Sequence, residues 1–141
     1  MACSFSGCAK GLSKLKILKV GDHALDATST YTDSDTVYRD QMCSYELYGE
    51  KGTVYNIHFE GNGPVDLIIL NPENYRRYDR ALDGYRSKER MKGWFYLNKK
   101  EVDIKFTQPD DQQYHFIIDN TYLMTNGANS GRSVAYTLTI S

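Results

Sequence analysis

Tyrosine and arginine are concentrated in one stretch of the sequence, Glu73 to Arg90, which reads ENYRRYDRALDGYRSKER. Aromatic rings and guanidinium groups are common where a protein contacts another protein or a sugar, because rings stack on flat surfaces and guanidinium groups bind carboxylates through paired hydrogen bonds. The side chains that could form such a surface are Tyr75, Arg76, Arg77, Tyr78, Arg80, Tyr85 and Arg86. This stretch is therefore the first candidate for a partner-binding site.

The same stretch has the periodicity of a short helix. Its apolar side chains recur at intervals of three, four and three residues, as one face of a helix requires: Tyr75, Tyr78, Leu82 and Tyr85. Pro72 suits the first turn and Gly84 the end, so a helical insert is expected near residues 73–86. Two interpretations stay open: the stripe covers a core while the arginines remain in water, or the stripe is the binding face. We expect a mixture, with Leu82 and at least one tyrosine buried and an exposed rim formed by Arg76, Arg77, Arg80 and Arg86.

Length and charge limit the classes of partner. The chain has 141 residues, a net charge of -1 and a pI near 6.3, so it has no general attraction for nucleic acid or anionic lipid. The basic residues of Glu73 to Arg90 are offset by acidic ones, which also argues against nucleic acid. No apolar run approaches the roughly 20 residues of a membrane-spanning helix. The length suits one domain, which we place at residues 14–141 after a flexible tail at residues 1–13.

Alternation of apolar and polar residues with a period of two indicates β-strands along the rest of the chain. It is clearest in Val134–Ile140, where every second residue is apolar, while Val65–Leu70 is apolar on both faces, as in a central strand. The expected strands are Leu15–Val20, Leu25–Tyr31, Tyr45–Tyr48, Thr53–Glu60, Val65–Leu70, Trp94–Leu97, Val102–Phe106, Tyr114–Ile118 and Val134–Ile140. Turns are expected at Asp33–Asp35, Gly49–Gly52, Gly61–Pro64 and Pro109–Asp111. Eight or nine strands predict an all-β, antiparallel, jelly-roll-like sandwich of two sheets.

The cysteines and the N-terminal residues bear on the cellular compartment. Cys3, Cys8 and Cys43 are an odd number, so at most one internal disulfide can form. In an oxidising compartment, a bridge from Cys43 to one of the other two would tie the tail to the sandwich. Phe5–Cys8 looks like the end of a bacterial lipoprotein signal, so a lipid anchor in the native precursor stays open. Zinc would need a histidine beside these cysteines, and no metal site is assigned.

Residues suited to catalysis are scattered, and no phosphate-binding loop or nucleophile motif occurs. His58 and His115 fall on the outward faces of expected strands, and His23 lies far from both. An acidic loop containing Asp33, Asp35 and Asp40 could supply oxygen ligands to calcium, although an Asp-x-Asp pair is not a complete ligand set. Asp119–Asn120 is expected to end a strand through side-chain to backbone hydrogen bonds. We therefore predict no enzyme and no cofactor.

The second half of the chain also carries a recognisable pattern, found in Val65–Pro72, Phe106–Asn120, Gly127 and Val134–Ile140. These segments resemble prokaryotic extracytoplasmic jelly-roll domains, of the bacterial pre-peptidase C-terminal type or the GOLD (emp24-like) type. The resemblance implies a β-sandwich and an extracytoplasmic location, secreted or in the cell envelope. The chain departs from the pattern at Gln112–Gln113, where such domains often have a glycine, and in the Glu73–Arg90 insert.

Together these patterns predict a non-enzymatic extracytoplasmic β-sandwich that acts by binding. Three function classes stay open. A protein-interaction or assembly module comes first, a carbohydrate-binding module second, and an enzyme whose residues converge only in three dimensions third. The partner is accordingly a protein or a glycan, and the Glu73–Arg90 stretch is its expected contact.

Overall fold

The computed structural model describes residues 30–47, 49–85, 90–128 and 131–141. Most of these residues form strands, and a single helix is described among them. Along the chain the elements are β1 (Tyr31–Val37), β2 (Gln41–Leu47), β3 (Val54–Leu70), α2 (Pro72–Leu82), β4 (Trp94–Thr107), β5 (Tyr114–Asn120) and β6 (Val134–Ile140). The prediction of an all-β protein with one short helical insert is confirmed. Within this part of the chain, no helix is long and apolar enough to cross a membrane.

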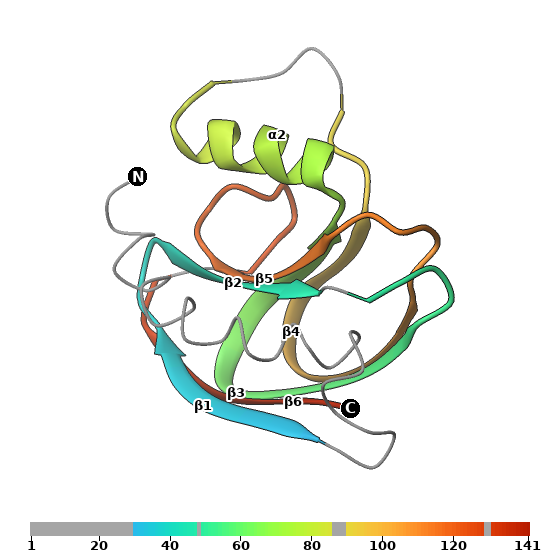
Figure 1. Cartoon of the computed structure of the whole chain (residues 1–141). Helices are drawn as coiled ribbons and strands as arrows, with labels where there is room; N and C mark the ends of the chain where they lie inside the picture. Colours follow the sequence, from blue (N-terminus) through green and yellow to red (C-terminus); the bar gives the residue numbers. More distant parts are fainter. Residues whose placement is uncertain (1–29, 48, 86–89, 129–130) are drawn as a thin grey trace.

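All strand pairs are antiparallel, and the bent strand β3 joins two layers. The strand order is β1-β6-β3-β5-β2, with β4 paired to β3 along its other edge. The first half of β3 pairs with β6, from Ile57 opposite Ile140, whereas its second half pairs with β5, from Asp66 opposite Asp119. The sheet therefore folds over itself, so that β1 and β6 face β2 and β5 (Figure 1). This curled sheet forms the predicted two-layer sandwich.

The described strands are fewer and longer than predicted. Gly61–Pro64 was expected to be a turn, but it is a bulged part of β3, because β4 has fewer residues between the partners of Glu60 and Val65. The expected strands at Trp94–Leu97 and Val102–Phe106 likewise join into β4. A bulge bends a strand without ending its pairing, and this bend carries β3 from one layer to the other. The glycines and proline thus mark a bend in a continuous strand.

Asp33–Asp35 was also predicted to be a turn, and this prediction is wrong. These residues lie within β1, where Asp33 is opposite Leu138 and Asp35 is opposite Tyr136 of β6. Ser34 Oγ adds a hydrogen bond to Thr137 Oγ1 at 3.1 Å. Pairing with β6 therefore overrides the local turn preference of aspartate and serine. The predicted strand at residues 15–20, most of the one at residues 25–31, and the tail at residues 1–13 lie outside the described residues.

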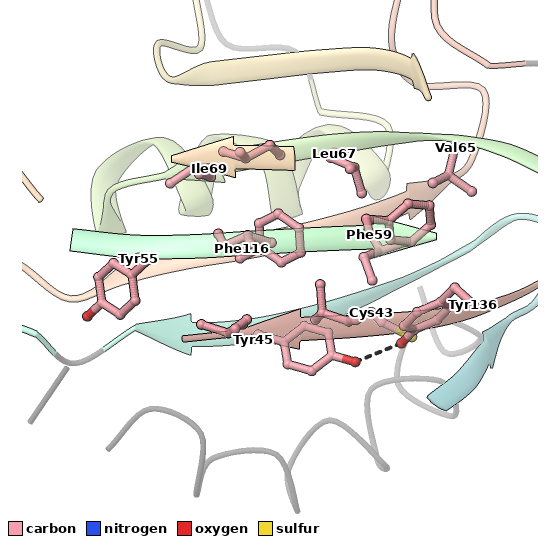
Figure 2. Close-up of a cluster of buried hydrophobic side chains, with 14 of the residues drawn as sticks. Cys43, Tyr45, Tyr55, Phe59, Val65, Leu67, Ile69, Phe116 and Tyr136 are labelled. Carbon is pink, nitrogen blue, oxygen red and sulfur yellow. Dashed lines mark hydrogen bonds between the residues drawn. The ribbon is translucent and has the colours of Figure 1, made fainter. Parts of the chain in front are cut away.

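The main core fills the space between the two layers. It is built from alternate residues of every strand, including the aromatic pairs Phe59–Tyr136 and Tyr55–Phe106, which stack with ring centroids 5.6 and 6.3 Å apart. Cys43 is fully buried in this core near Tyr136, and the hydroxyl groups of Tyr45 and Tyr136 are 2.8 Å apart (Figure 2). Cys3 and Cys8 lie outside the described residues, so the disulfide stays a prediction.

A second apolar cluster lies on the outer face of the β2, β5 and β3 layer. This is the face that α2 covers (Figure 1). Its fully or almost fully buried members are Met42, Ile68, Leu70, Tyr78 and Ile117. Because β3 faces the main core with Leu67 and Ile69 and this cluster with Ile68 and Leu70, its second half is buried on both faces. The prediction of a central strand at Val65–Leu70 is confirmed.

Gln108 joins the loop between β2 and β3 to the turn between β4 and β5. Its side chain is buried, and Nε2 donates to the carbonyl oxygens of Gly49 at 2.6 Å and of Asp110 and Gln112 at 2.8 Å. Replacing Gln108 with alanine removes this donor from buried acceptors, which costs about 1–3 kcal/mol of unfolding free energy. Urea denaturation of Gln108→Ala should give a loss of that size. In the control Gln112→Ala the exposed side chain contacts only its own turn, and an equal loss in both variants would contradict this assignment.

Candidate functional site

Helix α2 begins and ends where its sequence requires. The side chain of Asn71 caps its first turn by accepting a hydrogen bond from the Asn74 amide at 2.9 Å, and Pro72 follows the cap. Gly84, with φ of 90°, lies just beyond the end, in the left-handed region that glycine tolerates best. The helix therefore occupies Pro72–Leu82, within the predicted insert, and its orientation on the sheet is set by its apolar face.

The aromatic stripe of α2 packs mainly against the sheet. Tyr78 is 0% exposed in the outer cluster, so its side chain belongs to the core and not to an exposed binding surface, which corrects its place among the predicted contact residues. Tyr75 is half-buried and stacks on His115, with ring centroids 3.9 Å apart, while Leu82 packs against the same cluster. Tyr85 is 65% exposed. The expected burial of Leu82 and at least one tyrosine is confirmed, because Tyr78 is fully buried and Leu82 packs against the same cluster.

His115 lies under Tyr75 on the outward face of β5. Only 8% of the residue is exposed, and burial lowers the pKa of its imidazole to about 4. The ring is therefore neutral near pH 7, and its flat face contacts a neutral phenol. The sequence placed His115 correctly on the outward face, and the helix above it explains why that face is buried.

The described arginines of the insert lie on different parts of the α2 surface. Arg76 and Arg80 are exposed, whereas Arg77 is half-buried and donates to Asn74 Oδ1 at 3.0 Å and to Glu73 Oε1 at 2.9 Å. Arg86 lies outside the described residues. Arg77 thus contributes to a different surface, at the start of the helix.

That surface is a cleft of about 820 Å³ between the first turn of α2 and the start of β4. Its volume is within the range of about 300–1,000 Å³ that is typical of ligand sites. The residues that line it are Asn71, Glu73, Asn74, Arg77, Arg90, Lys92, Gly93, Trp94 and Tyr114. Sequence reasoning identified Glu73 and Arg77 as part of the insert but missed Lys92 and Trp94, which belong to the next segment. A lysine and the chain's only tryptophan so close to the insert were the available signal.

Short contacts fix the walls of this cleft. Asn74 Oδ1 accepts a hydrogen bond from the Lys92 amide at 2.7 Å, which ties the segment before β4 to the helix. A Cβ atom on Gly93 would lie 2.4 Å from the Ile69 carbonyl oxygen, so this close approach requires glycine. The Trp94 ring meets Phe106 edge to face at a centroid distance of 4.9 Å and remains 38% exposed. The tryptophan is therefore held in place while part of its ring stays open to the cleft.

The charge of the cleft is predominantly positive. Arg77, Arg90 and Lys92 contribute cations, and the single acidic wall residue, Glu73, is already paired with Arg77. A cleft with surplus cations beside an aromatic ring suits a ligand that carries a carboxylate or another anionic group near an apolar portion. The cleft is therefore suited to binding an anionic ligand.

The predicted calcium loop does not form. Asp33 and Asp35 lie on β1, where Asp33 Oδ2 accepts a hydrogen bond from the Tyr45 hydroxyl at 2.6 Å and Asp35 Oδ1 accepts one from the Thr36 amide at 2.7 Å. Asp40 lies in the following turn, with φ of 62°. Among the described residues, these three carboxylates do not form a group that could hold a metal ion. Calcium binding at this segment therefore has no support.

Two buried carboxyl groups lie opposite each other beneath α2. Asp66 on β3 and Asp119 on β5 are register partners, and both are 0% exposed. Asp66 Oδ1 accepts hydrogen bonds from the amides of Asn98 at 2.8 Å and Ala128 at 2.9 Å, and Asp119 Oδ1 accepts one from the Thr121 amide at 2.7 Å. Burial, and secondarily the charge of Asp66, raise the pKa of Asp119 to about 6, although hydrogen bonds from Thr121 lower it in part.

The strand-ending role predicted for Asp119–Asn120 is confirmed. The Asp119 bond to the Thr121 amide turns the chain after β5, and Asn120 Nδ2 donates to the carbonyl oxygens of Val37, Tyr38 and Arg132. The pairing with Asp66 was missed, although an aspartate inside the apolar run Val65–Leu70 was a signal for it.

No protein-family model and no curated protein sequence matches the chain. Among solved structures, it is similar to the Aeromonas hydrophila PliG, a periplasmic inhibitor of g-type lysozyme, with 12% identity, 82% of this chain and 87% of that chain covered, and a TM-score of 0.49. A pre-peptidase C-terminal domain of the Bacillus anthracis collagenase, the domain type that the sequence resembles, is 10% identical, with 80% of this chain and 88% of that chain covered and a TM-score of 0.46. The Salmonella Typhimurium PliG is 14% identical, with 83% of this chain and 94% of that chain covered and a TM-score of 0.45. At these identities, the similarity concerns the fold alone.

Proposed function

We propose that this chain is a non-enzymatic, extracytoplasmic protein-interaction module, and that the cleft between α2 and β4 holds an acidic segment of its protein partner. One observation supports this most directly: Arg77, Arg90 and Lys92 surround a partly exposed, rigidly held Trp94. Tryptophan and arginine are the residue types that most often dominate protein interfaces. The extracytoplasmic part of the proposal is supported by the lipoprotein-like Phe5–Cys8 and by the resemblance to pre-peptidase C-terminal domains.

The charges favour an acidic partner over a neutral sugar. A neutral sugar would use the Trp94 face and would gain little from three cationic side chains, whereas an acidic peptide would use both features. A proton-transfer role would need an available acid or base in the cleft, and its carboxylate, Glu73, is held by Arg77 at 2.9 Å. The cleft chemistry therefore supports binding, and the exposed Arg76 and Arg80 do not line the cleft.

Neutralising the cleft should weaken binding of an acidic peptide. We expect Arg90→Ser with Lys92→Ser to reduce affinity at least about tenfold, because each lost charge-assisted contact is worth on the order of 1 kcal/mol. The matched control, Arg76→Ser with Arg80→Ser, removes the same charge from the exposed side of α2 and should leave affinity within about twofold. Because Trp94 is the chain's only tryptophan, its fluorescence reports occupation of the cleft directly.

The probes are pools of acidic, neutral and basic peptides, together with a glycan array. Fluorescence changes with the acidic pool alone, weakened by added salt and by the cleft variant, would support the proposal. Equal weakening by the control variant would move the contact to the exposed arginines of α2. Selective binding of glycans, with no peptide response, would replace the protein-interaction assignment by a carbohydrate-binding one.

A further inference from the structure

Four polar side chains converge on the exposed face of the other layer, far along the sheet from α2. His58 and Glu60 lie on β3, and Asp103 and Glu101 lie directly opposite them on β4. Residues two apart on a strand share a face, and directly opposite residues have Cβ atoms about 4.5–5.5 Å apart, so all four occupy one small area. A nitrogen of His58 and carboxylate oxygens of Glu60 and Glu101 lie within 4.8 Å of one another.

Asp103 fixes which nitrogen of His58 faces the two glutamates. His58 Nδ1 lies 2.6 Å from Asp103 Oδ1, and His58 Nε2 lies 3.9 Å from Glu101 Oε2. Because Nδ1 is held by Asp103, Nε2 is the nitrogen that faces Glu101, and its lone pair is available to an ion when the ring is neutral. Histidines that bind metal ions commonly donate their second nitrogen to a carboxylate in this way, which fixes the tautomer and raises ligand basicity.

The two glutamates form an unfavourable pair without a cation between them. Glu60 is directly opposite Glu101, and like charges at such positions destabilise a sheet. Within the part of the chain that the structure describes, neither carboxylate forms an ion pair with a lysine or arginine. Both side chains are exposed and long, so their carboxylate oxygens, which already lie within 4.8 Å of each other and of a His58 nitrogen, are free to move toward a common ion.

We infer that His58, Glu60 and Glu101 form a binding site for a divalent transition-metal ion, best suited to Zn²⁺, with Asp103 as a positioning residue. Imidazole nitrogen and carboxylate oxygen both bind zinc, and three protein ligands leave the fourth position of a tetrahedral ion for water or a partner's ligand. An imidazole ligand disfavours Ca²⁺ and Mg²⁺, which prefer oxygen ligands. The site lies on strands β3 and β4 away from the α2 cleft, so it is independent of the proposed peptide site.

Zinc titration of the full chain tests the site. Isothermal titration calorimetry should give one Zn²⁺ per chain, unaffected by excess Ca²⁺, and Co²⁺ should replace it with a visible absorption band that reports its ligands. His58→Gln should lower zinc affinity at least about 100-fold, because it removes the only nitrogen ligand of the set. Glu60→Gln with Glu101→Gln should do the same. These residues are half-buried or exposed, so circular dichroism should show folded variants.

Two controls separate this site from the cysteines and from the other histidines. Cys3→Ser with Cys8→Ser, and separately His23→Gln, should leave zinc affinity within about twofold of the unmodified chain if the site is at His58. Zinc binding that survives His58→Gln and disappears with the cysteine variant would overturn the inference. No zinc binding by the unmodified chain would overturn it as well.

The role of Asp103 has its own readout. Asp103→Ala should lower zinc affinity by about 10- to 100-fold, and Asp103→Asn, which can still accept a hydrogen bond, should restore part of it. Imidazole nitrogen chemical shifts of His58 should show a mixture of tautomers in the alanine variant and one tautomer in the unmodified chain. Unchanged shifts and affinity in Asp103→Ala would contradict the positioning role.

Discussion

Replacing Tyr78 with alanine is expected to lower the free energy of unfolding by about 3–5 kcal/mol, the range for truncation of a large buried aromatic side chain. Tyr78 is 0% exposed and is the residue through which α2 enters the outer apolar cluster. Its ring contacts a surface formed by Ile68 and Leu70 of β3 and Ile117 of β5. Truncation leaves a cavity beneath the helix, because the surrounding side chains relax only partly into the space.

Tyr85 supplies the matched control for this measurement. It is the same residue type in the same insert, but it is 65% exposed, so Tyr85→Ala should change the unfolding free energy by less than about 0.5 kcal/mol. Chemical denaturation of both variants, followed by circular dichroism, gives the comparison. Equal, small losses for Tyr78 and Tyr85 would mean that α2 is not docked on the sheet, and the cleft between α2 and β4 would lose one of its walls.

The sequence predicts the elements whose signals are local. The α2 helix could be placed within a few residues, because Pro72 and Gly84 mark its ends and the spacing of Tyr75, Tyr78 and Leu82 defines its buried face. The last strand could be placed as Val134–Ile140 because its alternation is uninterrupted. In both cases the residues that determine the element lie inside it, so no knowledge of distant partners is needed.

The failures concern residues whose conformation depends on distant partners. Asp33–Asp35 has the composition of a turn but is extended because β6 pairs with it. Gly61–Pro64 stays within one strand because β4 pairs with β3 on either side of it, at Glu60 and Val65, and β6 pairs at Gly61. The same dependence explains the sites. Glu73 and Lys92, which lie far apart in the sequence, line one cleft only in the folded chain, and His58 approaches Glu101 only through the β3–β4 register. Local patterns of residues along the chain do not reveal that register.

The buried aspartate pair gives the second large effect, which depends on pH. In the folded protein the pKa of Asp119 is about 6, above the value of 3.8 for an ordinary aspartate, because burial and the nearby Asp66 disfavour its charge. A raised pKa means that folding favours the protonated acid. Its contribution to stability is therefore fully present below about pH 4, decreases as the pH rises from 4 to 6, and is lost above the folded-state pKa.

Asp119→Asn should consequently stabilise the protein at neutral pH. A shift of about two pKa units corresponds to about 3 kcal/mol, so the variant should gain up to that amount at pH 7.5 and almost nothing at pH 4. Asparagine keeps Oδ1 as the acceptor for the Thr121 amide and puts no charge opposite Asp66, the register partner of residue 119. The substitution thus removes the charge and preserves the turn after β5.

Urea denaturation at several pH values between 4 and 8 measures this effect as the difference between the variant and the unmodified chain. The control, Asp79→Asn, neutralises an exposed carboxyl group on α2, and its difference should stay within about 0.5 kcal/mol across the range. The difference for Asp119→Asn should instead increase between pH 4 and 6 and level off above. A pH-independent difference, or a loss of stability at pH 7.5, would show that Asp119 is ionised in the folded protein at no cost. In that case the buried backbone amides that donate to Asp66 and Asp119 would stabilise the negative charge.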